Sequence, residues 1–165
     1  MTFKEKLLEW LIRPERFYIR RYMHLLRKEE KYLLVRHNPV LGYWYRARKN
    51  RLGTRLGFLI HAGCLGEDIW IEHCGIVMIH PRARLGKGCK IHGSCCIGSN
   101  GGYPDDPPIL GDYVDIGLNA QVVGPVRIAD HVKIGSGAVV VKDVLVPGAT
   151  VVGVPARIIE PKQKA

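Results

Sequence analysis

The sequence lacks long apolar runs and a leader-like start. Its 165 residues contain no uninterrupted apolar stretch of about 18 residues, the length that indicates a membrane-spanning helix. At the start, the charged residues Lys4, Glu5 and Lys6 precede only a short apolar segment, which does not match a secretory signal peptide. We therefore expect a cytoplasmic protein.

Motifs for metal, dithiol and nucleic-acid chemistry are also missing. The five cysteines, at positions 64, 74, 89, 95 and 96, form no C-x-x-C pair. Three histidines, His73, His80 and His92, do not have the spacing that would bring them together around zinc. No RRM, KH or zinc-finger pattern occurs. We expect no bound metal and no nucleic-acid partner.

One pattern is strong: an aliphatic residue recurs every six positions from Ile79 to Ile158, with one interruption. A small or β-branched residue follows four places later, and Cys89 and Cys95 occupy that slot as apolar filler. A period of six indicates a parallel β-helix, in which each coil buries its aliphatic residues against the coils above and below. The recurring aliphatic positions are Ile79, Leu85, Ile91, Ile97, Leu110, Ile116, Val122, Ile128, Ile134, Val140, Val146, Val152 and Ile158.

The residues before this array favour helices. Amphipathic patterns predict helices over 3–13 and 15–36, and a shorter one over 41–52. Pro14 ends the first, and Asn38-Pro39 closes the second. We divide the chain into a helical extension, 1–57, a β-helix, 58–159, and a tail, 160–165.

The net charge of +10 belongs entirely to the extension. Residues 1–57 hold 15 Lys or Arg and 5 Asp or Glu, whereas residues 58–165 hold 10 of each. These helices could pack on the β-helix or on neighbouring subunits with a solvated basic face. Alternatively, they could lie on anionic lipid at the inner face of a membrane, where each nearby cation contributes about 1 kcal/mol.

The array is irregular in two places. Counting back from Ile79 puts His73 and His61 where aliphatic residues are expected, so the first coil is irregular. The step from Ile97 to Leu110 is one position longer than two hexads, and the segment 99–108 within it is rich in Gly and Pro. We expect this segment to project as a loop, where binding groups tend to lie.

Three stretches carry a family resemblance: IEHCGIVMIHPRARLGKGCKIHGSCCIG (71–98), ILGDYVDIGLNAQVVGPVRIADHVKIGSGAVVVKDV (109–144) and VVGVPARII (151–159). They resemble the left-handed β-helix acyltransferases, within the branch of serine acetyltransferases and polysaccharide O-acetyltransferases. The segment 44–58 resembles the polysaccharide-associated members. The resemblance implies a left-handed parallel β-helix with a short α-helical N-terminal extension.

The resemblance also implies an activity: transfer of acetyl from acetyl-CoA to a hydroxyl. Members of the family work as homotrimers that bind CoA between neighbouring β-helices, so active sites would lie between subunits. A hydroxyl is a poor nucleophile, so the reaction needs a general base and donors for the oxyanion. A non-catalytic β-helix scaffold is the alternative from another class.

His73 matches the family's catalytic histidine, because an acidic residue precedes it and Cys-Gly-Ile-Val-Met follows. Its phase in the repeat predicts a buried imidazole, which is costly unless it is paired. Because three hexads make a coil of about 18 residues, we expect His73 to stack on Ile91, with His92 beside it. We predict that His73 is the base and that His92 orients the acceptor or stabilises charge.

The sequence departs from the serine enzymes at two points. They pair the catalytic histidine with an aspartate before an Ile-His step, but Phe58-Leu59-Ile60-His61 holds no carboxylate there. Glu72 is a poor substitute, since consecutive strand residues point to opposite faces. The remaining candidates for orienting His73 are Glu67, Asp68 or a carboxylate from the neighbouring subunit, such as Asp105 or Asp106.

The second departure concerns the acceptor. Where serine enzymes carry an Arg-His pair before a Pro-Lys step, this chain reads Asp105-Asp106-Pro107-Pro108. A carboxylate acceptor would meet acid, so we predict a saccharide hydroxyl of surface polysaccharide, with serine as the alternative acceptor. The loop could also be a spacer. We expect acceptor contacts from Glu72, Tyr103, Asp105 and Asp106.

By family position, the CoA groove takes backbone groups from later coils, at Gly117, Asn119, Gly135, Ser136 and Ala138. Lys142 and Arg157 are suited to its phosphates, because charge-assisted contacts favour them. Each of these two cations could instead be solvated surface.

Overall fold

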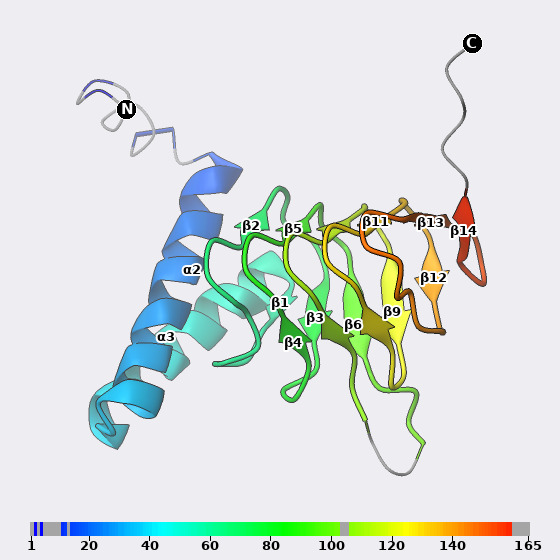
Figure 1. Cartoon of the computed structure of the whole chain (residues 1–165). Coiled ribbons are helices and arrows are strands. Elements are labelled where there is room, and N and C mark those ends of the chain that lie inside the picture. The colour runs from blue at the N-terminus through cyan, green and yellow to red at the C-terminus, as the bar shows by residue number, and fades with distance from the viewer. Residues whose placement is uncertain (1, 3, 5–10, 13, 103–105, 160–165) are drawn as a thin grey trace.

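The structure is a computed structural model that describes residues 2, 4, 11–12, 14–102 and 106–159. Two packed helices precede a long coil of short parallel strands (Figure 1). The expected helix over 3–13 falls largely outside the described residues. Within the described residues, no helix is long and apolar enough to cross a membrane.

The helical extension consists of α2 (Glu15–Glu30), a π-helical turn (Lys31–Val35) and α3 (Pro39–Leu56). The α3 helix is longer at both ends than the predicted span 41–52. It begins at Pro39 because the side chain of Asn38 accepts a hydrogen bond from the Leu41 N–H at 3.1 Å. It ends at Gly57, whose left-handed backbone (φ 80°) terminates the helix.

After α3, the chain visits three sheets in turn. The bounds of the strands in the five-stranded sheet are β1 (Phe58–Leu59), β3 (Val77–Ile79), β6 (Cys96–Gly98), β9 (Gln121–Val123) and β12 (Val139–Val140). Those of the three-stranded sheet are β4 (Arg84–Leu85), β7 (Ile109–Leu110) and β10 (Arg127–Ile128). Those of the six-stranded sheet are β2 (Trp70–Ile71), β5 (Lys90–Ile91), β8 (Asp115–Ile116), β11 (Lys133–Ile134), β13 (Thr150–Val152) and β14 (Arg157–Ile159).

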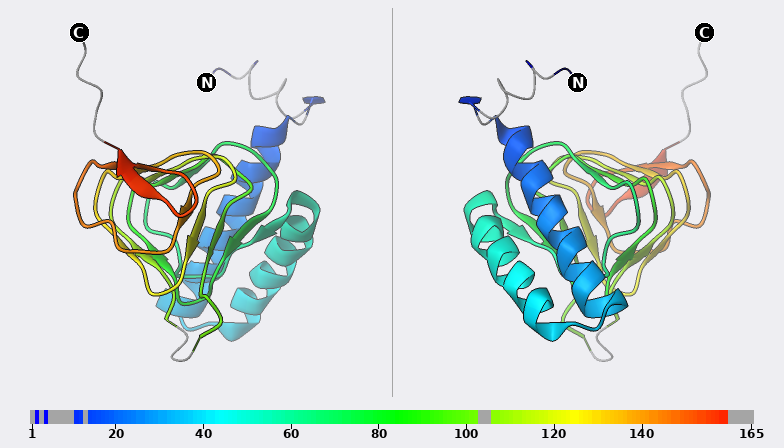
Figure 2. Two further views of the ribbon diagram at one scale, coloured as in Figure 1. Left: turned by 90° about the vertical axis from the view of Figure 1, so that its right-hand side faces the viewer. Right: turned by 90° about the vertical axis from the view of Figure 1, so that its left-hand side faces the viewer.

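Consecutive strands from β2 to β12 belong to successive sheets, and all their pairings are parallel. Seen along the coil, the strands form the sides of a roughly triangular section (Figure 2). This is the arrangement that the hexad period predicts, and the left-handed sense of winding stays a prediction. The last strand, β14, pairs antiparallel with β13.

The pairing register tests the repeat directly. Ile116 pairs with Ile134, and Val122 with Val140, so a regular coil is three hexads long, as predicted. Leu85 pairs with Leu110, which is 25 positions later, so the loop after β6 adds seven residues to one coil. The expectation that this loop lengthens two hexads by one position was therefore wrong, because Ile97 and Leu110 lie on adjacent sides of the coil.

The first coil is longer than a regular coil of three hexads, which changes the position of His73. Ile71 pairs with Ile91, two positions beyond three hexads, and both side chains are buried. Ile71 therefore occupies the inward position, and the predicted burial of His73 was wrong. The two extra positions in this coil move His73 out of the inward-facing position of the repeat.

The interior is a column of aliphatic side chains with small residues between them. Cys89 and Cys95 are buried there as free thiols, which confirms their role as filler, and burial raises the pKa of Cys89 to about 11. Each fully buried aliphatic side chain contributes about 1.5–3 kcal/mol to stability. Helix α2 covers the open first coil, where Tyr22 packs edge-on against Phe58 with ring centroids 5.1 Å apart.

Candidate functional site

The outward face of the six-stranded sheet carries a row of side chains that are mostly charged. Trp70 of β2 pairs with Lys90 of β5, and Lys90 pairs with Asp115 of β8. Asp115 pairs in turn with Lys133 of β11. Strand alternation places the next outward side chain two residues later, which puts Glu72 and His92 at the strand ends. The predicted residues Glu72 and His92 therefore lie on one face of neighbouring coils.

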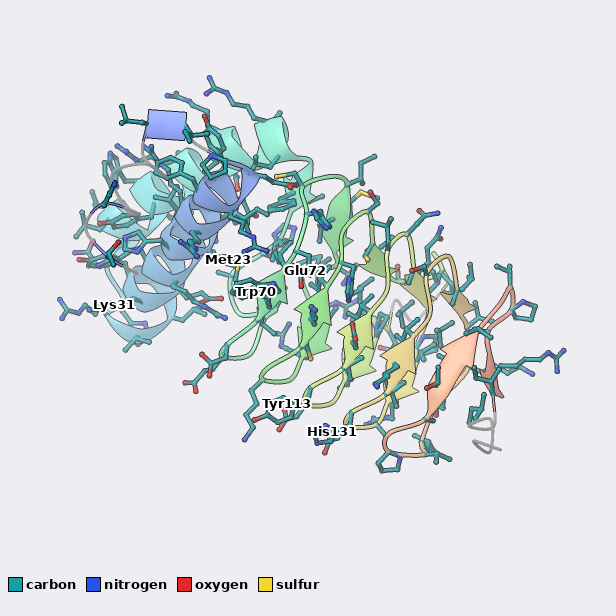
Figure 3. The ribbon with its side chains drawn as sticks, turned by 90° about the horizontal axis from the view of Figure 1, so that it is seen from above. Met23, Lys31, Trp70, Glu72, Tyr113 and His131 are labelled. Atoms are coloured by element: carbon teal, nitrogen blue, oxygen red, sulfur yellow. The ribbon has the colours of Figure 1, made fainter. Side chains whose placement is uncertain are left out.

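Both residues are held by contacts to charged side chains. The carboxylate Oε1 of Glu72 lies 2.7 Å from Nζ of Lys90, which holds the pKa of Glu72 at about 2. The Nε2 atom of His92 lies 2.8 Å from Oδ1 of Asp115. Figure 3 shows Trp70 and Glu72 beside α2, on the side of the coil that Met23 approaches. Sequence reasoning did not single out Lys90 and Asp115.

His73 lies at the corner between β2 and β3 and is exposed, with 64% of its side chain accessible. It does not stack on Ile91. A Cβ atom built on Gly93 would lie 3.4 Å from Cβ of His73, so Gly93 is the residue that underlies it in the next coil. His92 is next to Gly93 in sequence, so the two histidines still belong to one corner of adjacent coils.

The carboxylate that meets His73 comes from α2. Oε2 of Glu15 lies 3.3 Å from Nδ1 of His73, and Oε1 accepts a hydrogen bond from the backbone N–H of Cys74. That N–H lowers the pKa of Glu15, and the imidazole contact acts in the same direction. Within this chain, Glu15 and not Glu67 or Asp68 is the carboxylate that contacts His73, whereas pairing with Asp105 or Asp106 of a neighbouring subunit stays a prediction. An acidic residue after Pro14 was visible in the sequence, but no pattern there connects it to residue 73.

The acceptor loop is only partly described, since Tyr103 and Asp105 fall outside the described residues. Asp106 is exposed and lines a cavity of about 340 Å³ with Arg82, Ile109 and Arg127. The sequence prediction considered only the acidic residues of the loop, whereas Arg82 and Arg127 line the same cavity as this carboxylate. A bound carboxylate would meet both signs of charge.

The predicted CoA residues lie on successive coils. Position 117 has no room for a side chain, because a Cβ atom there would lie 2.6 Å from the backbone N of Ser136. Asn119 adopts a left-handed backbone (φ 59°) and is exposed, as is Ser136. Ala138 is fully buried, backbone included, and its N–H and C=O groups are both hydrogen-bonded within the coil, so it offers no exposed group to a ligand. The remaining three, Gly135, Lys142 and Arg157, are half-buried, exposed and exposed, respectively.

The arrangement supplies acid–base groups. Two imidazoles each contact a carboxylate, His73 with Glu15 and His92 with Asp115. An imidazole with one ring nitrogen bonded to a carboxylate can act as a general base through the other nitrogen. Among the described residues, no group of three or more His, Cys, Asp or Glu side chains is arranged to hold a metal ion.

Comparisons with known proteins agree on one kind of relative. A serine acetyltransferase of Mycobacterium tuberculosis is 36% identical over 134 residues, which are 74% of this chain and 58% of that protein. A Neisseria gonorrhoeae serine acetyltransferase, solved in complex with serine, superposes with a TM-score of 0.68 at 33% identity, over 84% of this chain and 55% of that one. The similarities support the hexapeptide-repeat acyltransferase family.

A third similar protein is a Brucella abortus serine acetyltransferase, solved in complex with coenzyme A. It superposes with a TM-score of 0.70 at 26% identity, over 83% of this chain and 54% of that one. No family model matches the sequence. The chain spans about half the length of the relatives that it matches. The polysaccharide O-acetyltransferase branch finds no support in these comparisons.

Proposed function

We propose that this chain transfers an acetyl group from acetyl-CoA to a hydroxyl, with His73 as the general base. The observation that carries the proposal is the contact between Nδ1 of His73 and Glu15, which leaves Nε2 on the opposite side of the ring to accept a proton. The exposure of His73 at a coil corner gives a substrate access to it. The similarity to serine acetyltransferases supports the same reaction.

In the proposed reaction, Nε2 of His73 takes the proton of the hydroxyl as its oxygen attacks the thioester carbonyl carbon. The tetrahedral intermediate then collapses, and the bond from carbon to sulfur breaks. The imidazolium returns its proton to the departing CoA thiolate. His92, held by Asp115, is positioned to orient the acceptor at the same corner.

Acetyl-CoA would lie along the later coils. The exposed residues Asn119 and Ser136 offer hydrogen-bonding side chains on successive coils, and the half-buried Gly117 and Gly135 let a ligand approach the backbone closely. The backbone N–H groups of Gly117, Gly135 and Ala138 already donate within the coil. The coenzyme A complex of the Brucella relative supports this choice of donor. Lys142 and Arg157 are exposed cations for its phosphates. We propose a homotrimer in which this groove is completed by the neighbouring β-helix.

Serine is the acceptor that the comparisons favour. The relatives are serine acetyltransferases, and one of them was solved with serine bound. Arg82 and Arg127 beside the loop can compensate Asp106 when a carboxylate binds. We therefore propose serine first.

A saccharide hydroxyl is the second candidate, and one observation favours it. The serine enzymes' Arg-His pair is replaced by Asp105-Asp106, so the groups that would hold the charged ends of an amino acid are not the same here. Carboxylates commonly accept hydrogen bonds from hydroxyl groups, which suits a neutral sugar.

One assay separates these candidates. Thiol release from acetyl-CoA is followed with serine, neutral sugars and UDP-sugars as acceptors. Selective turnover of serine supports the first candidate, and selective turnover of a sugar supports the second. If no acceptor stimulates thiol release, the result supports a non-catalytic β-helix scaffold and contradicts the proposed enzyme.

We also propose that the helical extension contacts anionic lipid. A groove of about 380 Å³ between α2 and α3 is lined by four arginines, Arg21, Arg48, Arg51 and Arg55, and by no carboxylate. Around the turn that joins the helices, large apolar side chains are exposed, among them Val35, Val40, Tyr43 and Trp44. Basic side chains beside exposed aromatic residues suit the headgroup region of an anionic bilayer.

Point variants test the lipid contact better than deletion, because removing the helices would uncover Phe58 and Ile60. We expect Arg21→Glu with Arg51→Glu to reduce binding to vesicles that contain phosphatidylserine. The control pair is Lys87→Glu with Lys133→Glu, which carries the same charge change on the coil. If wild-type protein does not bind these vesicles, or if both pairs bind equally, the lipid contact is refuted.

A further inference from the structure

This chain lacks the aspartate that serine acetyltransferases carry before the Ile-His step, so another group must orient the ring of His73. Leu59 stands at that place and its side chain is largely exposed, so β1 supplies no carboxylate to His73. A histidine that acts as a base needs its second ring nitrogen bonded, because that bond selects the tautomer and orients the ring. It also gains from a nearby negative charge while the imidazolium exists.

Glu15 meets this requirement from a distant part of the chain. Its two oxygens contact consecutive residues of the coil, Oε2 with Nδ1 of His73 at 3.3 Å and Oε1 with the N–H of Cys74. Contacts at both oxygens fix the orientation of the carboxylate. Glu15 is 58 positions before His73, so the pairing depends on how α2 docks against the coil.

Helix α2 is anchored by buried side chains. The first turn of this helix also favours an ionised carboxylate. Ile19, Tyr22 and Leu26 of α2 are buried in the core of the coil. Glu15 lies in the first turn of α2, where the helix dipole stabilises a negative charge. The N-cap residue, Pro14, makes no side-chain hydrogen bond, and Glu15 directs its oxygens to the coil.

We propose that Glu15 is the positioning residue of the base His73, in the role that an aspartate before Ile60 would otherwise fill. This inference rests on the proposed function of His73. Glu15 accepts a hydrogen bond from Nδ1–H, which leaves Nε2 unprotonated and directed to the acceptor hydroxyl. When Nε2 takes the hydroxyl proton, the proton on Nδ1 stays on His73 and Glu15 pairs with the positive ring.

A purely structural role would differ from this in its consequences. Glu15 could simply fasten the start of α2 to Cys74. Loss of such a fastening lowers stability, but it leaves the protonation state of the His73 ring and the pH profile of turnover unchanged. The variant Glu15→Gln separates the two roles, since its amide oxygen can still accept from Cys74 while the negative charge is lost.

We expect Glu15→Gln to lower kcat by about 10- to 100-fold, by analogy with the loss of a carboxylate that orients a metal-bound histidine. The KM for acetyl-CoA should stay within about twofold, because the CoA groove is on later coils. The acidic limb of the kcat/KM profile should move to lower pH, because protonation of the base loses its nearby anion. The matched control is Glu67→Gln, an exposed carboxylate of the same coil.

The charged neighbours keep their own partners in this variant, since Glu72 pairs with Lys90 and His92 with Asp115. Wild-type kcat and an unmoved acidic limb in Glu15→Gln would overturn the inference. A lower thermal stability together with an unchanged pH profile would also overturn it, because Glu15 would then only fasten the start of α2 to the coil.

A readout without turnover keeps this inference separate from the proposed function. In protein labelled with ¹⁵N-histidine, the ring of His73 should be the Nδ1–H tautomer above its titration range, and Glu15→Gln should shift it toward Nε2–H. His73→Ala identifies the resonance. If wild-type protein releases no thiol with any acceptor, the proposed function fails, whereas a wild-type His73 ring in the Nε2–H tautomer overturns the role of Glu15 alone.

Discussion

The carboxylate of Glu29 lies 2.9 Å from the ammonium of Lys49, and only 1% and 3% of their side chains are accessible. Arg46 contacts the other oxygen of Glu29 at 2.7 Å, and Lys49 donates to the carbonyl oxygen of Ile60 at 2.7 Å. This buried pair joins α2, α3 and the beginning of the coil. It therefore helps set the position of the helix that carries Glu15.

Removing one member of the pair should be costly. We expect Glu29→Ala to lower the free energy of unfolding by about 3–5 kcal/mol, because it leaves the Lys49 ammonium buried without a counter-ion. Urea unfolding measures the change. The exposed Glu67→Ala is the control and should change stability by less than about 0.5 kcal/mol.

The double variant Glu29→Met with Lys49→Met provides a further check. Because both charges are gone, it should recover most of the stability that Glu29→Ala loses. Equal stability of wild type and Glu29→Ala would contradict the structural importance of the pair.

Replacing the proposed base should affect the chemical step. We expect His73→Ala to lower kcat by roughly 100-fold or more, because the hydroxyl loses its proton acceptor. Steady-state thiol release measures this. His92→Ala should mainly raise the KM for the acceptor, given its proposed orienting role. Turnover like that of wild type in His73→Ala would transfer the role of base to His92, which has a carboxylate partner of its own in Asp115.

The proposed phosphate contacts predict a selective effect on the donor. We expect Lys142→Ala and Arg157→Ala each to raise the KM for acetyl-CoA about tenfold, the size of one charged hydrogen bond, with kcat unchanged. The effect should vanish with acetyl-pantetheine, which lacks the nucleotide phosphates. Lys87→Ala, another exposed cation, is the control. Equal losses with both donors would mean that these cations do not meet phosphate.

The Glu72–Lys90 contact predicts a pH dependence. The pKa of Glu72 is about 2, below the ordinary value of 4.5, because Lys90 donates a hydrogen bond to the carboxylate. The stabilisation is complete above pH 4.5, the unfolded value, and is lost as pH falls toward 2. Lys90→Met should return the titration of Glu72 to near its ordinary value, as ¹³C carboxyl NMR measures. An identical titration midpoint in both proteins would refute the pairing.

The regular coils were predictable because a six-residue period reports a local environment that repeats. Each of Ile116, Val122 and Ile134 meets the same kind of neighbour one coil away, so the sequence alone indicated their burial and pairing. The six-residue period could not predict the structure of the segments where the repeat is interrupted. The lengthening of the coil by the loop after β6 and the longer first coil appear only in the register of Leu85 with Leu110 and of Ile71 with Ile91.

The motif in the sequence indicated His73 and His92 as candidates, and their roles stay predictions. Their surroundings could not be predicted, and the predicted burial of His73 failed because the first coil is longer than three hexads. Asp115 was missed as the partner of His92, because 23 positions separate them across the inserted loop.

By itself, the sequence determined a parallel coil of hexads, a helical extension that holds the excess positive charge, and a histidine motif typical of acyl transfer. Only the tertiary structure decided that Glu15 meets His73 and that Glu29 is buried against Lys49. The reason is physical: coil repeats impose their own spacing, but the docking of α2 depends on how Tyr22 and its neighbours pack against the first coil. No period in the sequence encodes that packing.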